Sequence, residues 1–116
     1  MTIGFLLRTG PYTSQNVDTV YHLAKRILQR GNQVRIFLYE DGTINLNKNI
    51  QSPQERNLAG MMKELADGGA QVQACGTCAK FRGIKKDDLV EGTKLGGMAV
   101  FVNYVSECDR FLSFGF

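Results

Sequence analysis

The sequence predicts an α/β fold, in which a mainly parallel sheet of four to five strands lies between helices as a three-layer sandwich. Three observations favour this class: short apolar runs recur along the chain, amphipathic helical segments alternate with them, and the first run is apolar without a polar alternation. An unbroken apolar run is typical of a strand covered on both faces. Alternating strands and helices imply right-handed crossovers between parallel strands.

The length of 116 residues suits a single domain spanning residues 1–116. A hydrophobic fraction of 43% and a charged fraction of 22% are ordinary globular values, which exclude a disordered or fibrous chain. No apolar run approaches the ~20 residues of a membrane-spanning helix. The opening run at residues 2–7 has no basic region before it and is too short for a signal peptide. We therefore expect a cytoplasmic protein without a membrane partner.

The first half of the chain predicts a strand, a helix and a second strand. The strand is Ile3–Leu7, and turn residues follow it over 8–14. The helix is expected to begin near Asn16, as its N-cap, and to end at Gly31. Residues 34–39 then form the second strand. The helix carries one apolar stripe at helical spacing, made of Val17, Val20, Tyr21, Ala24, Ile27 and Leu28.

The middle of the chain predicts a loop and a second helix. Residues 43–52 have no clear period and hold several asparagines, which indicates a long surface loop. A helix is expected to begin with Ser52 as its cap and Pro53 at its first position, and to end at the glycine pair 68–69. Its apolar stripe consists of Leu58, Met61, Met62 and Leu65.

The last part of the chain predicts three short strands and two helical segments. Residues 70–74 form the third strand, and one helical turn over 79–81 ends at Gly83. Residues 89–90 form a short fourth strand, and residues 110–114 form the last one. A helix over 96–106 is expected to place one apolar stripe on its main face, with Leu95 just before it: Met98, Ala99, Val102 and Val105.

The strongest chemical signal is the C-x-x-C motif of Cys75 and Cys78. Cys75 directly follows the third strand, and sites in open α/β folds lie at the carboxyl ends of strands. Free N–H groups of a following helical turn, with Lys80 and Arg82 nearby, favour a nucleophilic thiolate. The alternative is a pair of small core cysteines, but the polar and glycine neighbours argue against deep burial. Three cysteines, an odd number, indicate reduced thiols rather than a disulfide framework.

Other candidate sites are weaker. Cys108 is expected to be structural, and His22 lies off the apolar stripe of its helix, so a four-ligand zinc site is not expected. The loop beginning at Gly10 lacks a phosphate-binding or dinucleotide-binding motif, so no cofactor is expected. The net charge is +3, and its densest basic stretch, residues 80–86, is followed at once by two aspartates. Nucleic acid is therefore not an expected partner.

These residues also carry a family likeness. The chain resembles the small DsrE/DsrF-like proteins of the sulfur-relay superfamily, which includes the DsrE/TusD sulfur carriers and has the DsrEFH-like fold. The most specific part of the resemblance is the segment Cys75–Ile84. More general parts are the Ile3–Leu7 strand, the turn before the first helix, the Val34–Phe37 strand and the tail Asp109–Phe114.

The resemblance implies a sulfur-relay function. Cys75 occupies the carrier position, seven residues before Arg82, and would take sulfur as a persulfide from a donor protein and pass it to an acceptor protein. Cys78, absent from the best-known carriers, would allow attack on that persulfide with formation of a disulfide. The resemblance also implies a five-stranded sheet and a homotrimer or homohexamer. Whether the protein is itself a sulfurtransferase enzyme stays open.

Two other functions stay open at this point. One is thiol–disulfide redox chemistry through Cys75 and Cys78, and the other is a non-catalytic oligomeric binding module. A thioredoxin-like fold is disfavoured because Pro11 and Pro53 both precede the cysteines, whereas that fold needs a cis-proline facing them. Aromatic residues near the end of the chain, and a second apolar face of the 96–106 helix, predict a homo-oligomer. These residues are Phe101, Tyr104, Phe111, Phe114 and Phe116.

Overall fold

The computed structural model describes all residues from Met1 to Phe116 and contains one five-stranded sheet. Its strands are β1 (Thr2–Leu7), β2 (Gln33–Leu38), β3 (Gln71–Cys75), β4 (Lys94–Gly96) and β5 (Arg110–Phe114). They lie in the order β4-β3-β2-β1-β5, and every neighbouring pair is parallel. The predicted α/β class with a parallel sheet is confirmed.

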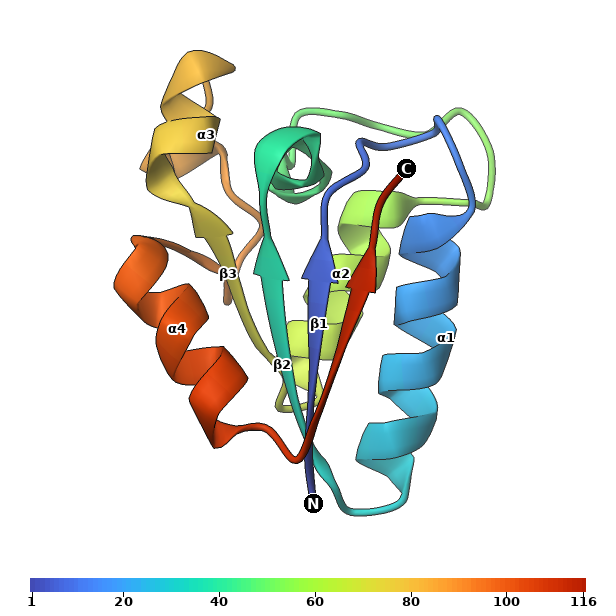
Figure 1. The fold of residues 1–116 in the computed structure, drawn as a ribbon. Helices are drawn as coiled ribbons and strands as arrows, with labels where there is room; N and C mark the ends of the chain where they lie inside the picture. Colours follow the sequence, from blue (N-terminus) through green and yellow to red (C-terminus); the bar gives the residue numbers. More distant parts are fainter.

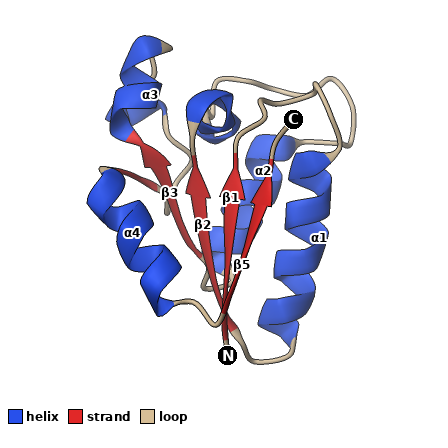
Figure 2. Ribbon diagram, in the orientation of Figure 1, coloured by secondary structure: helices blue, strands red, loops and turns tan.

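Helices cover both faces of the sheet (Figures 1 and 2). The α-helices are α1 (Asn16–Gln29), α2 (Leu58–Asp67), α3 (Gly76–Phe81) and α4 (Met98–Glu107), and the 3-10 helices are η1 (Glu40–Leu46) and η2 (Lys86–Asp88). Because side chains alternate along a strand, Ile36 points toward α1 and α2 and its neighbour Phe37 points toward α4. The α1/α2 side holds a cluster of 19 buried residues and the α4 side a cluster of only four. The single helix α4 therefore buries fewer residues on its side of the sheet than α1 and α2 bury on theirs.

Two side chains, of Phe111 and Cys108, occupy the space above Gly4 of β1. A Cβ atom at Gly4 would lie 2.4 Å from the ring of Phe111 and 2.7 Å from the sulfur of Cys108. The missing side chain is what lets Phe111 pack edge-on to Phe101, with ring centroids 5.8 Å apart. The Phe111 ring, packed above Gly4, thus connects the start of β5 to α4.

Helix α1 begins at Asn16 as predicted, but the predicted cap of α1 and the predicted start of α2 are wrong. Asn16 is the first helical residue and not the cap; its side-chain amide donates to Thr9 Oγ1 at 3.2 Å. Helix α2 begins at Leu58, so residues 52–57 are not helical. The Arg56 guanidinium donates to Asp18 Oδ1 at 2.9 Å, which ties this segment to α1. Asn57, whose Oδ1 accepts from the Gly60 N–H at 3.1 Å, is the cap instead of Ser52.

The predicted surface loop and fourth strand are also wrong in part. Residues 43–46 belong to η1, and Thr43, Asn45 and Leu46 are buried. The apolar pair at residues 89–90 packs on this 3-10 helix, with the Val90 N–H donating to the Leu46 carbonyl at 2.8 Å. The fourth strand of the sheet is therefore formed later in the chain, by Lys94–Gly96 against the end of β3.

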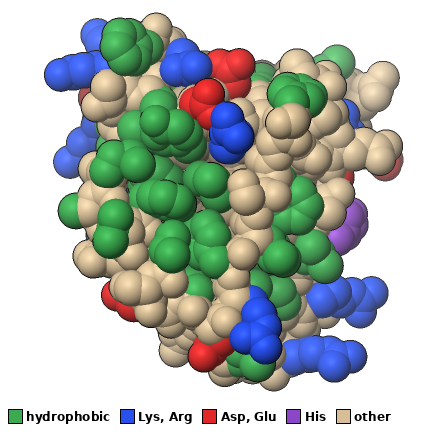
Figure 3. Space-filling model, viewed as in Figure 1, with side chains coloured by type: hydrophobic (Ala, Val, Ile, Leu, Met, Phe, Trp, Pro, Cys, Tyr) green, Lys and Arg blue, Asp and Glu red, His purple; other side chains and the backbone are tan.

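Helix α4 turns the opposite face to the sheet from the one predicted. Tyr104 is 4% exposed, and Phe101 packs on Phe37 with ring centroids 5.3 Å apart. Met98, Val102 and Val105 are 49%, 61% and 44% exposed. The aromatic side chains bury more area than the aliphatic ones, so they take the sheet-facing side and leave the aliphatic stripe outside. Figure 3 shows the resulting apolar surface, which extends over α4.

Candidate active site

The two cysteines of the C-x-x-C motif lie at the carboxyl edge of the sheet, as the sequence predicts. Cys75 is the last residue of β3 and also the N-cap of α3. Its extended backbone, with φ −60° and ψ 120°, turns the sulfur back over the first turn of the helix. There Cys75 Sγ accepts a hydrogen bond from the Cys78 backbone N–H at 3.5 Å. An N–H group aimed at this sulfur stabilises negative charge that develops on it.

Both thiols are buried, which corrects the expectation of a shallow site. Cys75 is 4% exposed and Cys78 is 9% exposed, and they form one cluster with Phe37 and Tyr104. The polar residue between them, Thr77, faces solvent, because the helical turn separates inward from outward positions. The rings of Phe37 from β2 and Tyr104 from α4 thus cover the sulfur atoms.

The surroundings of Cys78 keep its thiol protonated. Burial raises the pKa of Cys78, and the hydrogen bond with Cys75 acts in the same direction. The backbone N–H of Glu40 and the charge of Arg82 lower the pKa, but these effects are weaker. Burial also raises the pKa of the third thiol, Cys108, at the end of α4. The protonated Cys78 is therefore a poor nucleophile beside Cys75 at neutral pH.

Arg82 lies at the end of α3 and joins it to η1. Its Nε donates to Asp41 Oδ1 at 2.8 Å, and its Nη1 donates to the carbonyl of Cys78 at 2.9 Å. The two aspartates that follow it in the sequence, Asp87 and Asp88, are not its partners. Arg82 therefore belongs to the same site as Cys78, held there by a carboxylate from a different element.

The segment Glu40–Asp41 belongs to this site although the sequence analysis did not single it out. Glu40 has a φ of 53°, which is uncommon outside glycine, and its side chain forms an ion pair with Arg8. That conformation turns the chain sharply after β2 and brings the Glu40 N–H to Cys78. The only local signal is the Asp41-Gly42 turn, which says nothing about a cysteine more than 30 residues away.

The remaining predicted candidates lie elsewhere. His22 is exposed on α1 and packs edge-on to Tyr21. Cys108 is partly buried beside the start of β1. The loop after β1 binds its own polar groups, with Thr13 Oγ1 donating to the Gly10 carbonyl at 2.9 Å. No group of three or more His, Cys, Asp or Glu side chains is placed to hold a metal ion.

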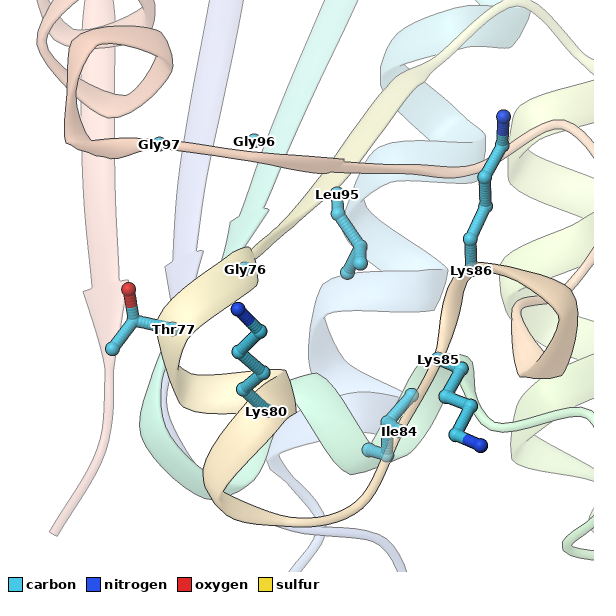
Figure 4. Close-up of a pocket in the computed structure, with 9 residues that line it drawn as sticks. All are labelled: Gly76, Thr77, Lys80, Ile84, Lys85, Lys86, Leu95, Gly96 and Gly97. Atoms are coloured by element: carbon cyan, nitrogen blue, oxygen red, sulfur yellow. The ribbon is translucent and has the colours of Figure 1, made fainter.

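Two cavities lie near the cysteine segment. A groove of about 560 Å³ is lined by residues of α3, the segment before η2 and the entry to α4, as Figure 4 shows. A second cavity, of about 350 Å³, includes Phe37, which also contacts the thiols. Its other lining residues are Leu6, Arg8, Tyr39, Glu40, Met98 and Phe101. No helix of the chain combines the length and apolar character needed to cross a membrane.

Comparison with known proteins gives a consistent result. The model of the DsrE/DsrF-like family matches residues 1–114. A protein of Methanopyrus kandleri is 36% identical over 97% of this chain and 93% of its own. A protein of Allochromatium vinosum named as the sulfurtransferase DsrE is 26% identical, covering 99% of each chain. The sulfurtransferase TusD of Erwinia tasmaniensis is 25% identical over 94% of this chain and 97% of its own. The crystal structure of the ychN protein from E. coli shares the fold, with a TM-score of 0.91, 22% identity and coverage of 98% and 99%.

Proposed function

Because this chain belongs to the DsrE/DsrF-like family, whose named members include sulfurtransferases, we propose that it is a sulfur-relay protein that carries sulfur as a persulfide on Cys75. The observation that carries the proposal is the hydrogen bond from the Cys78 N–H to Cys75 Sγ at the carboxyl edge of the sheet. In the loading step the Cys75 thiolate attacks the terminal sulfur of a donor persulfide. The new S–S bond forms on Cys75, and the donor thiolate leaves with the electron pair.

Burial supports carriage rather than rapid turnover. A persulfide on Cys75, enclosed by Phe37 and Tyr104, is shielded from solvent thiols. The raised pKa of Cys78 keeps the neighbouring thiol protonated, so it attacks the persulfide slowly. The sulfur then stays available until an acceptor protein takes it. Arg82, close enough to lower the pKa of Cys78, would favour the anionic state of the site during transfer.

The same two thiols support a second function, thiol–disulfide exchange. Their membership in one buried cluster, with the Cys78 N–H directed at Cys75 Sγ, places them for reaction with each other. When Cys78 is deprotonated, its thiolate attacks the inner sulfur of the Cys75 persulfide. A Cys75–Cys78 disulfide forms, and hydrosulfide leaves.

Mass spectrometry after incubation with a protein persulfide distinguishes these functions. Carriage predicts that the wild-type protein and Cys78→Ser both retain one added sulfur atom, whereas Cys75→Ser retains none. Thiol–disulfide exchange predicts a disulfide in the wild-type protein and a stable persulfide only in Cys78→Ser. Cys108→Ser is the control for the third thiol and should load normally. If the protein takes up no sulfur at Cys75, both carriage and thiol–disulfide exchange are contradicted. The remaining function is then the non-catalytic binding module.

The apolar surface on α4 supports a homo-oligomer as part of the proposal. Met98, Val102 and Val105 form an exposed aliphatic stripe, and Phe81 of the neighbouring α3 is 83% exposed. Exposed apolar patches of this kind mark interfaces. We assign the trimer or hexamer to this face, next to the cysteine segment, where assembly would shelter the persulfide further. A cytoplasmic location belongs to the same proposal, because the carrier cysteine must be a free thiol before each loading and a reducing compartment keeps thiols free.

A further inference from the structure

The hydroxyl of Tyr104 is a buried polar group without a hydrogen-bond partner. The side chain is 4% exposed and packs in the same cluster as Phe37, Cys75 and Cys78. Burial raises the pKa of Tyr104, so the hydroxyl keeps its proton at neutral pH and stays available as a donor. Because an unpartnered buried hydroxyl costs free energy, an intermediate that completes its hydrogen bonding is stabilised there.

Gln73 of β3 lies beside this hydroxyl and faces the same way as Cys75. Next to burial, the largest influence on the pKa of Tyr104 is the Gln73 side chain, which lowers it and so lies close to the hydroxyl oxygen. Gln73 and Cys75 are two residues apart on one strand, so both side chains leave it on the same side of the sheet. Gln73 is also paired with Phe37 of β2, which points toward α4. The amide, the hydroxyl and the cysteine therefore share the α4 side of the sheet.

Gly96 leaves room for the Gln73 amide at the level of Cys75. Gly96 of β4 is paired with Cys75 of β3. A Cβ atom on Gly96 would lie 2.6 Å from Gln73 Oε1, so the amide occupies the space that a side chain would fill. Neighbouring strands are about 4.8 Å apart, which places the end of the Gln73 side chain about one strand spacing from Cys75. Val100 of α4 covers the same space, with its Cγ2 3.0 Å from that Cβ position.

We propose that the Gln73 amide, positioned by the Tyr104 hydroxyl, binds the outer sulfur of a persulfide on Cys75. The outer sulfur is attached through an S–S bond of about 2 Å, which extends it from Sγ toward the amide. Rotation about the Cβ–Sγ bond moves the outer sulfur without moving Sγ, so the hydrogen bond from the Cys78 N–H is kept. The proposal rests on the proposed function of Cys75 and adds the binding site of the carried sulfur.

The hydrogen bonds of this subsite form a short chain. One N–H of the Gln73 amide donates to the anionic outer sulfur, and the amide oxygen accepts from the Tyr104 hydroxyl. A half-turn of the amide group exchanges its nitrogen and oxygen, so both contacts are made without moving the backbone. Tyr104 touches the amide and not the sulfur, so it is a positioning residue. The carried sulfur then lies beneath α4, away from thiols in the solvent.

The experiment measures how long loaded Cys75 keeps its sulfur in the presence of cyanide, in proteins that all carry Cys78→Ser so that no disulfide forms. Cyanide attacks the outer sulfur and leaves as thiocyanate, and the Cys75 thiolate takes the electrons of the broken S–S bond. Gln73→Met keeps the length of the side chain without the amide. It should shorten the half-life of the persulfide about tenfold, the contribution of a hydrogen bond to a charged group. Gln71→Met is the matched control, because Gln71 lies on the same side of β3 but is exposed and farther from Cys75; it should change the half-life less than twofold.

Three further variants test the geometry. Tyr104→Phe should shorten the half-life about threefold yet leave the Tm unchanged or higher, because it removes only an unpartnered polar atom. Gly96→Ala introduces a methyl group 2.6 Å from Gln73 Oε1, so it should displace the amide and shorten the half-life as Gln73→Met does. Gly97→Ala, whose Cβ would have no atom within 4 Å, should not. The double variant Gln73→Met/Tyr104→Phe should be no worse than Gln73→Met, because the hydroxyl acts through the amide.

The possible outcomes separate the subsite from the proposed function. Equal half-lives of the persulfide in the parent protein, Gln73→Met and Tyr104→Phe would overturn the subsite and leave carriage on Cys75 intact. A lower Tm of Tyr104→Phe with an unchanged half-life would assign the hydroxyl to the fold and overturn its positioning role. Additive effects in the double variant would overturn that role as well. If Cys75 takes up no sulfur at all, the proposed function fails, and the subsite fails with it.

Discussion

Replacement of Arg82 by glutamine tests whether this side chain serves the thiols or only the fold. The variant loses the ion pair between Arg82 and Asp41. The two side chains are 27% and 63% exposed, so solvent screening limits the contribution of this pair to stability to about 0.5 kcal/mol. It also loses the hydrogen bond to the Cys78 carbonyl, worth about 1 kcal/mol. The sum of about 1.5 kcal/mol corresponds to a fall in Tm of about 6 °C for a domain of this size.

Arg82→Gln should also slow sulfur loading, which a modest loss of stability does not produce by itself because the protein stays folded. Arg82 lowers the pKa of Cys78 through its charge, so it contributes positive potential at the thiol of this residue, whose backbone N–H donates to Cys75 Sγ. We expect Arg82→Gln to load Cys75 about tenfold more slowly, a change equivalent to about 1.4 kcal/mol in the barrier. Arg82→Lys keeps the charge and should recover most of the rate.

The matched control is Asp41→Asn, which removes the same ion pair but leaves the guanidinium in place. It should lower the Tm by about 2 °C and leave the loading rate unchanged or faster. Thermal unfolding and single-turnover loading followed by mass spectrometry measure the two effects on the same samples. Equal slowing of loading by Arg82→Gln and Asp41→Asn would refute the electrostatic role and assign Arg82 to the joint between α3 and η1.

Three further predictions concern stability and assembly. Gly42→Ala should lower the free energy of unfolding by about 2–3 kcal/mol in chemical denaturation, because the new Cβ would lie 2.0 Å from the Leu7 carbonyl oxygen. The control Gly97→Ala, whose Cβ would have no atom within 4 Å, should change the free energy of unfolding by under about 1 kcal/mol. The pKa of Cys78 is raised in the fold, so stability should be full below about pH 8.5 and fall at higher pH as the unfolded thiol ionises, with a smaller fall in Cys78→Ser. Val102→Asp on α4 should give a monomer in light scattering, whereas Leu23→Asp on α1 should not; an unchanged mass for both would contradict the α4 interface.

Much of the fold follows from local patterns. The stripe from Val17 to Leu28 predicts the buried face of α1, since Val17, Val20, Tyr21 and Ala24 are all buried. The apolar run Ile3–Leu7 predicts a strand in the interior of the sheet, and β1 has neighbours on both sides. Such local patterns suffice to predict the buried face of an element when the element has one apolar face and only one neighbouring surface can cover it.

Helix α2 and helix α4 show where local patterns fail. Ser52-Pro53 is a good helix start in isolation, but the contact between Arg56 and Asp18 holds the chain in another conformation until Asn57. On α4 two apolar stripes compete, and the aromatic stripe prevails because Phe37 of β2 lies beneath it. In both cases a contact with a residue distant in the sequence determines the structure, namely the start of α2 and the buried face of α4. The local periodicity therefore does not predict it.

The sequence by itself determined that this chain alternates strands and helices and that a C-x-x-C motif ends a strand at the carboxyl edge of the sheet. Both are properties of neighbouring residues, which periodicity and chain order encode directly. Only the tertiary structure decided that Cys75 and Cys78 are buried, that Arg82 pairs with Asp41, and that the Tyr104 hydroxyl is buried without a partner. Burial, ion pairing and hydrogen bonding between side chains depend on which distant elements meet, and that follows from the packing of the sheet with its helices rather than from any segment alone.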